Sequence, residues 1–107
     1  MITNYAGTAI LEYGSTAPVY VTFTPGTSTF QITSAPTYQL LRQDGSALAS
    51  GTVSGYNTAA GTPEAWHYVA GTVAPGWYDL RFVANGTVSG ESNPRRYAPT
   101  VLLRVVR

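Results

Sequence analysis

Hydrophobic and polar residues alternate most regularly between Thr72 and Ala84, in the stretch TVAPGWYDLRFVA. Pro75 and Gly76 predict a turn, because proline fixes φ at the first corner and glycine accepts a positive φ at the next. In the strand that follows, the uncharged residues on one side are Tyr78, Leu80, Phe82 and Ala84. The other side carries Trp77, Asp79, Arg81 and Val83. We therefore expect the first set to lie in the core and the second on a surface that faces water or another subunit.

Further strands are predicted on both sides of this one, where β-branched and aromatic residues recur between Gly, Pro and Asp breaks. Their ranges are 8–13, 19–24, 27–33, 37–42, 47–53, 65–72 and 100–107. Their inward residues are expected to include Val19, Val21, Phe23, Phe30, Ile32, Tyr38, Leu40, Leu48 and Val53. For 65–72 the pattern leaves open whether the side of Trp66 or the side of His67 faces inward. The last strand is apolar on both sides.

The turn signals between these strands differ in strength. Asp44-Gly45 lies between two apolar runs, which is among the strongest short hairpin signals, so 37–42 and 47–53 should pair. Residues 54–64 contain Gly, Thr and Asn and predict a loop. Asn85-Gly86 predicts the start of another turn, and a long loop is expected to continue to Arg96.

Together these segments predict one all-β domain over residues 1–107, with 1–7 as a polar lead-in. Seven or eight strands are expected, spaced by about 8–15 residues, and no window shows the apolar spacing of a helix. Many short strands joined by Gly- and Pro-containing turns are typical of a sandwich or a barrel.

The content of charged residues is unusually low, at 10% of the chain against about 25% in typical soluble domains. Fifteen Thr, eight Ser and eleven Gly supply much of the polar surface instead. A neutral, hydroxyl-rich surface resists self-association only weakly, which suits a subunit of an assembly. Charge is uneven: residues 1–75 carry −2, with one Arg against three acids, and residues 76–107 carry +3, with five Arg against two acids.

Composition also argues against several classes of function. A net charge of +1 is too small for the dense basic stripe of a nucleic-acid-binding protein. The chain has no Cys, which removes disulfides, thiol catalysis and Cys-based zinc sites without fixing the compartment. Residues 1–5 lack the basic start and apolar run of a signal peptide, and no apolar stretch approaches the length of a membrane span.

The sequence does not predict a catalytic or metal site. General acid–base or nucleophilic catalysis needs a positioned base beside an acid or nucleophile. The single His, His67, lies in a predicted strand between Trp66 and Tyr68, and the five carboxylates are scattered among different elements. No group of residues has the spacing of metal ligands. We therefore expect a protein that is not an enzyme and that has no cofactor.

The segment PGWYDLRF resembles the late strand of immunoglobulin-like sandwiches, where a Pro-Gly corner leads into an aromatic-rich strand. Tyr78 matches the tyrosine near the start of that strand, whose hydroxyl binds back to the preceding corner. The order PTYQLLRQDGSALASGT, then APGWYDLRF, then an apolar terminal strand covers about residues 36–107. This order resembles the small Cys-free Ig-like domains of tailed-bacteriophage virion proteins.

The resemblance implies a structural protein of a tailed-phage virion, made in the host bacterial cytoplasm. It would decorate or cement the capsid, or serve as an accessory subunit at the head–tail neck or tail, and act by protein–protein adhesion as a symmetric oligomer. The residues expected to bind the partner are Trp77, Arg81, Arg95, Arg96, Arg104 and Arg107. Arg95 and Arg96 are expected in a docking loop, and the terminal strand is expected to pair with a partner's sheet edge.

The alternative is a carbohydrate-binding or adhesion module of a tail or cell-surface protein. Thirteen aromatic residues are many for 107, and Tyr or Trp rings on a sheet face stack on sugar rings. The candidates, if they point outward, are Trp77, Tyr20 and His67.

Overall fold

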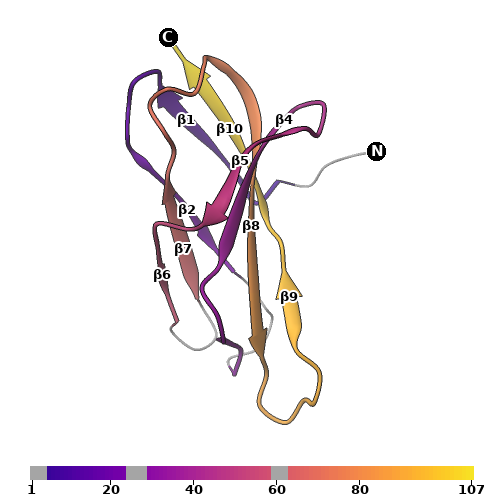
Figure 1. Cartoon of the computed structure of the whole chain (residues 1–107). Coiled ribbons are helices and arrows are strands. Elements are labelled where there is room, and N and C mark those ends of the chain that lie inside the picture. Colours follow the sequence, from indigo (N-terminus) through magenta and orange to yellow (C-terminus); the bar gives the residue numbers. More distant parts are fainter. Residues whose placement is uncertain (1–4, 24–28, 59–62) are drawn as a thin grey trace.

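The computed structural model describes residues 5–23, 29–58 and 63–107 and arranges them in ten β-strands (Figure 1). The strands are β1 (Gly7–Glu12), β2 (Pro18–Thr22), β3 (Gln31–Ile32), β4 (Thr37–Arg42), β5 (Ala47–Thr52), β6 (Gly55–Asn57), β7 (Glu64–Tyr68), β8 (Gly76–Thr87), β9 (Arg95–Tyr97) and β10 (Thr100–Val106). The described part contains no helix, and therefore none long and apolar enough to cross a membrane.

These strands form two sheets that pack against each other in a sandwich-like, elongated molecule of 48 × 30 × 19 Å (Figure 1). The larger sheet has the order β1-β10-β8-β4-β5, with the short strands β3 and β9 added on either side of the far end of β8. The smaller sheet has the order β2-β7-β6. All neighbours are antiparallel except β1 and β10, which run parallel. The predicted all-β class is confirmed.

Strand β8 is the centre of the fold, as the alternation between Thr72 and Ala84 predicts. Its inward residues Leu80, Phe82 and Ala84 are fully buried, and Tyr78 is nearly so. The Tyr78 hydroxyl donates a hydrogen bond of 2.6 Å to the carbonyl oxygen of Ala74 in the preceding corner. This bond ties the start of β8 to the turn that precedes it, as expected for this tyrosine.

The opposite wall of the core comes from the smaller sheet. Val19, Val21 and Phe23 point inward from β2 and the residue just after it, as predicted. On β7 the inward side is the one with Ala65 and His67, which resolves the alternative that the sequence leaves open. Phe30 and Ile32 are also buried as predicted, although only Gln31–Ile32 of the range 27–33 is a strand, and 24–28 lie outside the described residues.

The β4–β5 hairpin is confirmed, but the predicted burial of one of its residues, Leu48, is wrong. Gly45 has a φ of +91° in the turn, and the Asp44 carboxylate accepts hydrogen bonds from the Ser46 amide and hydroxyl, which lowers the Asp44 pKa. Leu48, predicted to be buried, is exposed, while Val53 is buried. The pairing register shifts between Leu40 and Leu41, and β5 lies at the edge of the sheet beside β4. As a result every residue of β5 is exposed.

Two predicted loops contain strands. Within 54–64, Gly55–Asn57 forms β6 beside β7, and 59–62 lie outside the described residues. Asn85-Gly86 is not a turn: β8 continues to Thr87, because Gly86 is paired with Ile32 on one side and Arg95 on the other. The turn comes instead at 88–94, where Gly90 has a φ of +87°.

Candidate functional site

The outward side of the larger sheet carries an exposed mixed patch, which we call the Trp77 face. Its residues are Ile10, Trp77, Asp79, Arg81, Leu102 and Arg104. The pairing register places three of them in one row across neighbouring strands: Ile10 on β1, Arg104 on β10 and Trp77 on β8. The Ile10 side chain is 65% exposed and the Trp77 side chain 48%, so neither is needed to fill the core.

Arg104 and Trp77 are in direct contact within this row. The guanidinium carbon of Arg104 lies over the Trp77 ring, 4.8 Å from its centroid. A cation–π contact at an exposed site contributes about 0.5–1 kcal/mol, enough to hold the ring in a preferred orientation. Trp, Tyr and Arg are the residues enriched at the energetic centres of protein interfaces. The row therefore has the chemistry of an anchor for a protein partner.

Asp79 separates this row from Arg81 on β8. Its carboxylate oxygen Oδ1 accepts hydrogen bonds from the Tyr5 hydroxyl at 2.8 Å and from Gln43 Nε2 at 3.0 Å. The bond to Asp79 raises the pKa of Tyr5, because losing the phenolic proton would place a second anion beside the carboxylate. Asp79 is thus satisfied by neutral donors from the lead-in and the β4–β5 hairpin, and the carboxylate binds the lead-in to the sheet.

Two of the predicted partner residues, Arg95 and Arg96, are not brought together. Both lie on strand β9 and not in a loop, so their side chains point to opposite faces. Arg95 donates hydrogen bonds from Nε and Nη2 to the Glu91 carboxylate at 2.8–3.0 Å. Its Nη1 donates to the Tyr97 hydroxyl at 3.0 Å. The contact with Glu91 raises the Arg95 pKa further. The predicted loop is therefore wrong at Arg95 and Arg96, which lie on a strand, and Arg95 is paired within its own hairpin; their contact with a partner stays a prediction.

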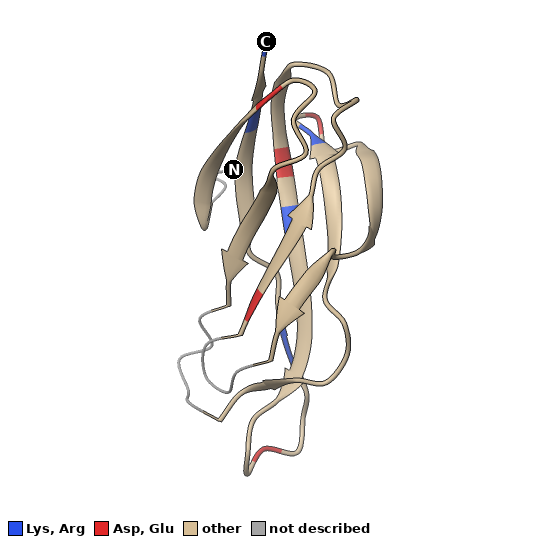
Figure 2. Ribbon diagram, turned by 90° about the vertical axis from the view of Figure 1, so that its left-hand side faces the viewer, with Lys and Arg blue, Asp and Glu red and all other residues tan. Residues whose placement is uncertain are grey.

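The remaining arginines stay on the surface. Arg96 borders a shallow hollow on the outward side of the larger sheet, beside Thr37 and Val83. Arg81, Arg96 and Arg107 have no ion-pair partner among the residues that the structure describes. Figure 2 shows that charged positions are few and that the basic ones lie on or beside the larger sheet.

The terminal strand does not have a free edge for a partner. Along β10, residues Thr100–Val105 pair with β8, and Val101–Val106 pair with β1. The prediction of edge pairing by this strand is therefore wrong. The sequence predicts a strand of mixed pattern at 8–13 but not its pairing partner; the observed strand, β1, covers the second edge of β10.

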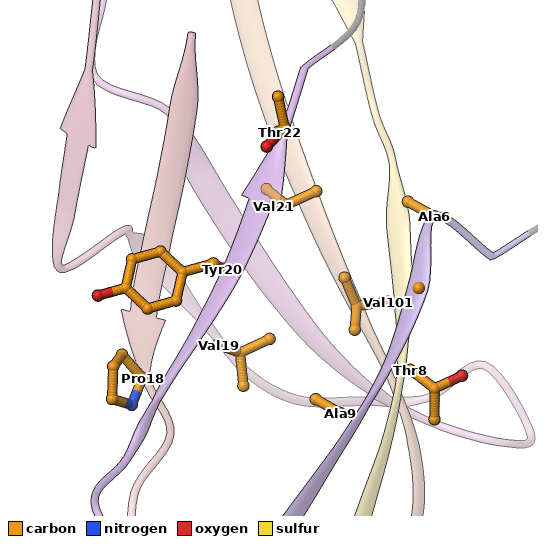
Figure 3. A pocket seen from close by; sticks show the side chains of 10 residues that line it. Ala6, Thr8, Ala9, Pro18, Val19, Tyr20, Val21, Thr22 and Val101 are labelled. Atoms are coloured by element: carbon orange, nitrogen blue, oxygen red, sulfur yellow. The ribbon is translucent and has the colours of Figure 1, made fainter. Parts of the chain in front are cut away.

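A groove lies where the two sheets meet along their open side, between β1 and β2 (Figure 3). Its volume is about 560 Å³. Val19, Val21, Ala9 and Val101 turn toward the space between the two ribbons, whereas the Tyr20 ring points away from it toward β7. Among the described residues, β1 pairs with β10 alone and β2 with β7 alone. The groove is thus bounded by two strand edges over an apolar floor.

His67 points inward, between the sheets, so it is not an outward candidate for sugar stacking. Its ring stacks on Tyr38 of the opposite sheet with centroids 3.6 Å apart, and Nδ1 is 3.2 Å from the Ser54 hydroxyl. Burial lowers the His67 pKa. The hollow that it lines, about 400 Å³, has no carboxylate among its described lining residues. No group of three or more potential metal ligands occurs in the described ranges.

The smaller sheet has an outward side of different chemistry that the sequence only partly indicates. We call it the aromatic face; its residues are Pro18, Tyr20, Thr22, Gly55, Asn57, Glu64, Trp66 and Tyr68. Tyr20 is outward as the alternation of 19–24 predicts. Trp66 joins it because His67, its neighbour on β7, faces inward.

This chain was compared with known families, sequences and structures. Neither a protein-family model, nor a curated protein sequence, nor a solved structure matches this chain. The structure thus offers two exposed faces, one rich in Arg with an exposed Trp and Ile, and one neutral and aromatic. They lie on opposite sides of the sandwich.

Proposed function

We propose that this chain is an Ig-like structural subunit of a tailed-phage virion, on the capsid or at the head–tail neck, that acts by protein–protein adhesion. The observation that carries the adhesive role is the exposed row of Ile10, Arg104 and Trp77. An exposed Trp in contact with an Arg, in one row with an exposed Ile, has the composition that is typical of interface centres.

The strand order supports the Ig-like part of the proposal. Immunoglobulin-like sandwiches place B, E and D in one sheet and C, F and G in the other, and variable-type domains add C′ beside C. When β2, β4, β5, β6, β7, β8 and β10 take the letters B, C, C′, D, E, F and G, the sheets become B-E-D and G-F-C-C′. The bond from Tyr78 to Ala74 occupies the position of the tyrosine corner, near the start of strand F.

The virion part of the proposal rests on the resemblance and on composition. Charged residues make up only 10% of the chain, and its net charge is +1, so copies repel one another weakly when they are crowded in an assembly. The Trp77 face would contact a neighbouring virion protein in several symmetric copies. Arg81 and Arg96 on the same side of the larger sheet would pair with carboxylates at the rim of that contact.

The test measures association of the purified chain with purified capsid, neck and tail components of one phage, by light scattering and by sedimentation with assembled particles. Wild type is expected to bind one component, and the pair W77A/R104A to weaken that binding at least about tenfold, the loss typical of interface anchors. The matched control is Tyr68→Ala, which removes an exposed ring from the opposite sheet. Failure of wild type to bind any component, or equal loss in the control, would contradict the proposal.

A further inference from the structure

The aromatic face displays rings that the fold itself does not need. Tyr20 is 60% exposed and Tyr68 51%, so both rings add little to the buried core. Trp66 lies between them: it is opposite Tyr20 in the β2–β7 pairing and two residues before Tyr68 on the same side of β7. Residues two apart on a strand are about 6.5–7 Å apart, so the three rings lie near one another on the same side of β7 and β2.

The orientation of the Trp66 ring is built into the sheet. Its neighbour across β6 is Gly55, and a Cβ at Gly55 would lie 2.6 Å from the ring nitrogen Nε1, closer than real Cβ atoms approach. The absence of a side chain at Gly55 therefore lets the indole lie down over the β6 backbone. On its other flank the Tyr20 ring is tilted by 38° with centroids 5.7 Å apart. Trp66 is half-buried in this position, and its ring lies along the sheet instead of standing out from it.

The charge and polarity of the face limit what can bind there. Among its described residues Glu64 is the single charged group. Glu64 lies on the same side of β7 as Trp66 and is paired with Thr22 across the sheet. The face therefore combines stacking surface with a carboxylate acceptor and a hydroxyl. Unlike the Trp77 face, it has no Arg and no Leu, Ile, Val or Met among its described residues.

We propose that the aromatic face is a binding site for a neutral oligosaccharide. The C–H surface of a sugar ring carries partial positive charge and stacks on the negative face of an aromatic ring, here Trp66 and Tyr20. Sugar hydroxyls donate to the Glu64 carboxylate and exchange hydrogen bonds with Thr22. The negative charge of Glu64 disfavours acidic sugars. Tyr20 and Thr22 also border the β1–β2 groove, but the Tyr20 ring points away from it toward β7, so stacking takes place on the outward side of the sheet (Figure 3).

The position of the two tryptophans allows a direct measurement. In Trp77→Phe the chain keeps one Trp, and its fluorescence reports on Trp66 alone. The probes are short neutral oligosaccharides of glucose, galactose, mannose and N-acetylglucosamine, with oligogalacturonate as the acidic counterpart. We expect saturable quenching or a shift of the emission by at least one neutral probe, with matching heat in calorimetry, and weaker binding of oligogalacturonate.

Substitutions separate a sugar site from a general surface effect. Tyr20→Ala and Glu64→Gln are each expected to weaken binding about tenfold or more, whereas Tyr20→Phe, which keeps the stacking ring, stays within about threefold. The matched control Tyr13→Ala, which removes another exposed Tyr away from the face, should leave the affinity unchanged. Thermal unfolding of each variant checks that it folds.

Three outcomes would overturn the proposal: no neutral probe changes the Trp66 emission or gives heat, Tyr20→Ala binds as tightly as its parent, or oligogalacturonate binds more tightly than the neutral sugars. Self-association that Tyr20→Ala abolishes, without sugar binding, would also overturn it and assign the face to a second copy of the chain. None of these outcomes depends on the Trp77 face, so the adhesion proposal is tested separately.

Discussion

Replacing Gly86 by Ala tests the least expected feature of the fold, which is the continuation of β8 past Asn85-Gly86. Gly86 is buried and is paired with Ile32 of β3 on one side and with Arg95 of β9 on the other. A Cβ placed there would collide with the backbone carbonyl oxygen of Gln31 and would lie 2.6 Å from two ring atoms of Phe30. Real Cβ atoms essentially never approach within 3.0 Å of another heavy atom, so β3 has to move.

The expected loss of stability follows from the groups that the added methyl group displaces. The Phe30 ring is fully buried and meets Tyr97 edge-on with centroids 5.0 Å apart, so it has little room to retreat. Overpacking of this kind costs about 1–3 kcal/mol. Displacing β3 also strains the hydrogen bond from the Thr33 amide to the Asn85 carbonyl, worth about 0.5–1.5 kcal/mol. We expect Gly86→Ala to lower the free energy of unfolding by about 2–4 kcal/mol in total.

Urea or thermal unfolding measures this loss, which corresponds to a fall in Tm of roughly 10–25 °C for a domain of this size. The matched control is Gly7→Ala, where an added Cβ meets nothing within 4 Å; it should leave stability unchanged or raise it by up to about 1 kcal/mol. Adding Phe30→Leu to Gly86→Ala should recover part of the loss, since it trims one of the two colliding groups. Equal stability of the two Gly→Ala variants would refute the close packing of β3 and Phe30 against Gly86.

Two further predictions concern the corner and the sheet interface. Tyr78→Phe removes the hydrogen bond to Ala74 without changing the packing of the ring, so denaturant unfolding should show a loss of about 0.5–1.5 kcal/mol; no loss would mean that the corner is held by other contacts. Burial places the His67 pKa in the folded chain below its ordinary value near 6.5, so the unfolded chain takes up the proton first and stability falls as the pH drops below about 6.5. Unfolding measured against pH should show this decline in wild type and not in His67→Gln; an identical slope in both would assign it to other groups.

The sequence predicts the core side of β8 well because alternation and charge agree there. Asp79 and Arg81 fix the outward side, which leaves Tyr78, Leu80 and Phe82 for the core. The hairpin at Asp44-Gly45 is predicted for a similarly local reason, since the residue that needs positive φ is a glycine. Where the local residue pattern and the burial favour the same conformation, a single sequence is enough to predict the strand or turn.

The errors arise where pairing partners decide the outcome. Asn85-Gly86 has the composition of a turn, but Gly86 is needed for the close approach of Phe30 and β3, which no local pattern reveals. Leu48 has the periodicity of an inward residue, but β5 is an edge strand with a shifted register, and the Leu48 side chain lies at the exposed border of the hollow beside His67. Likewise the parallel pairing of β1 with β10 joins opposite ends of the chain, and nothing local to the terminal strand indicates it.

In the candidate sites too, the sequence indicates residue types, whereas strand pairing decides which residues are neighbours. Trp77 and Arg104 are far apart in the sequence and become neighbours only through the β8–β10 register, while Ile10 enters the same row through the parallel strand. In the sequence, Arg95 appears equivalent to Arg96, yet an adjacent position on a strand reverses its direction and brings it onto Glu91. Residue type therefore indicated the kind of candidate residue, and strand register decided which candidates are neighbours.

The separation of chemistry between the two outward faces follows from the sandwich itself. Two sheets packed on a common core turn their outer sides in opposite directions, so a partner seated on the Trp77 face leaves the aromatic face open to solvent. The basic residues of the last third of the chain lie on β8, β9, β10 and the terminal Arg107, which are parts of the larger sheet or its end, and the smaller sheet keeps a single acid, Glu64. A subunit held to an assembly by one sheet would thus display a neutral, ring-lined surface outward. The proposed adhesion and the proposed sugar binding are compatible in one copy of the chain, because they would use different strands.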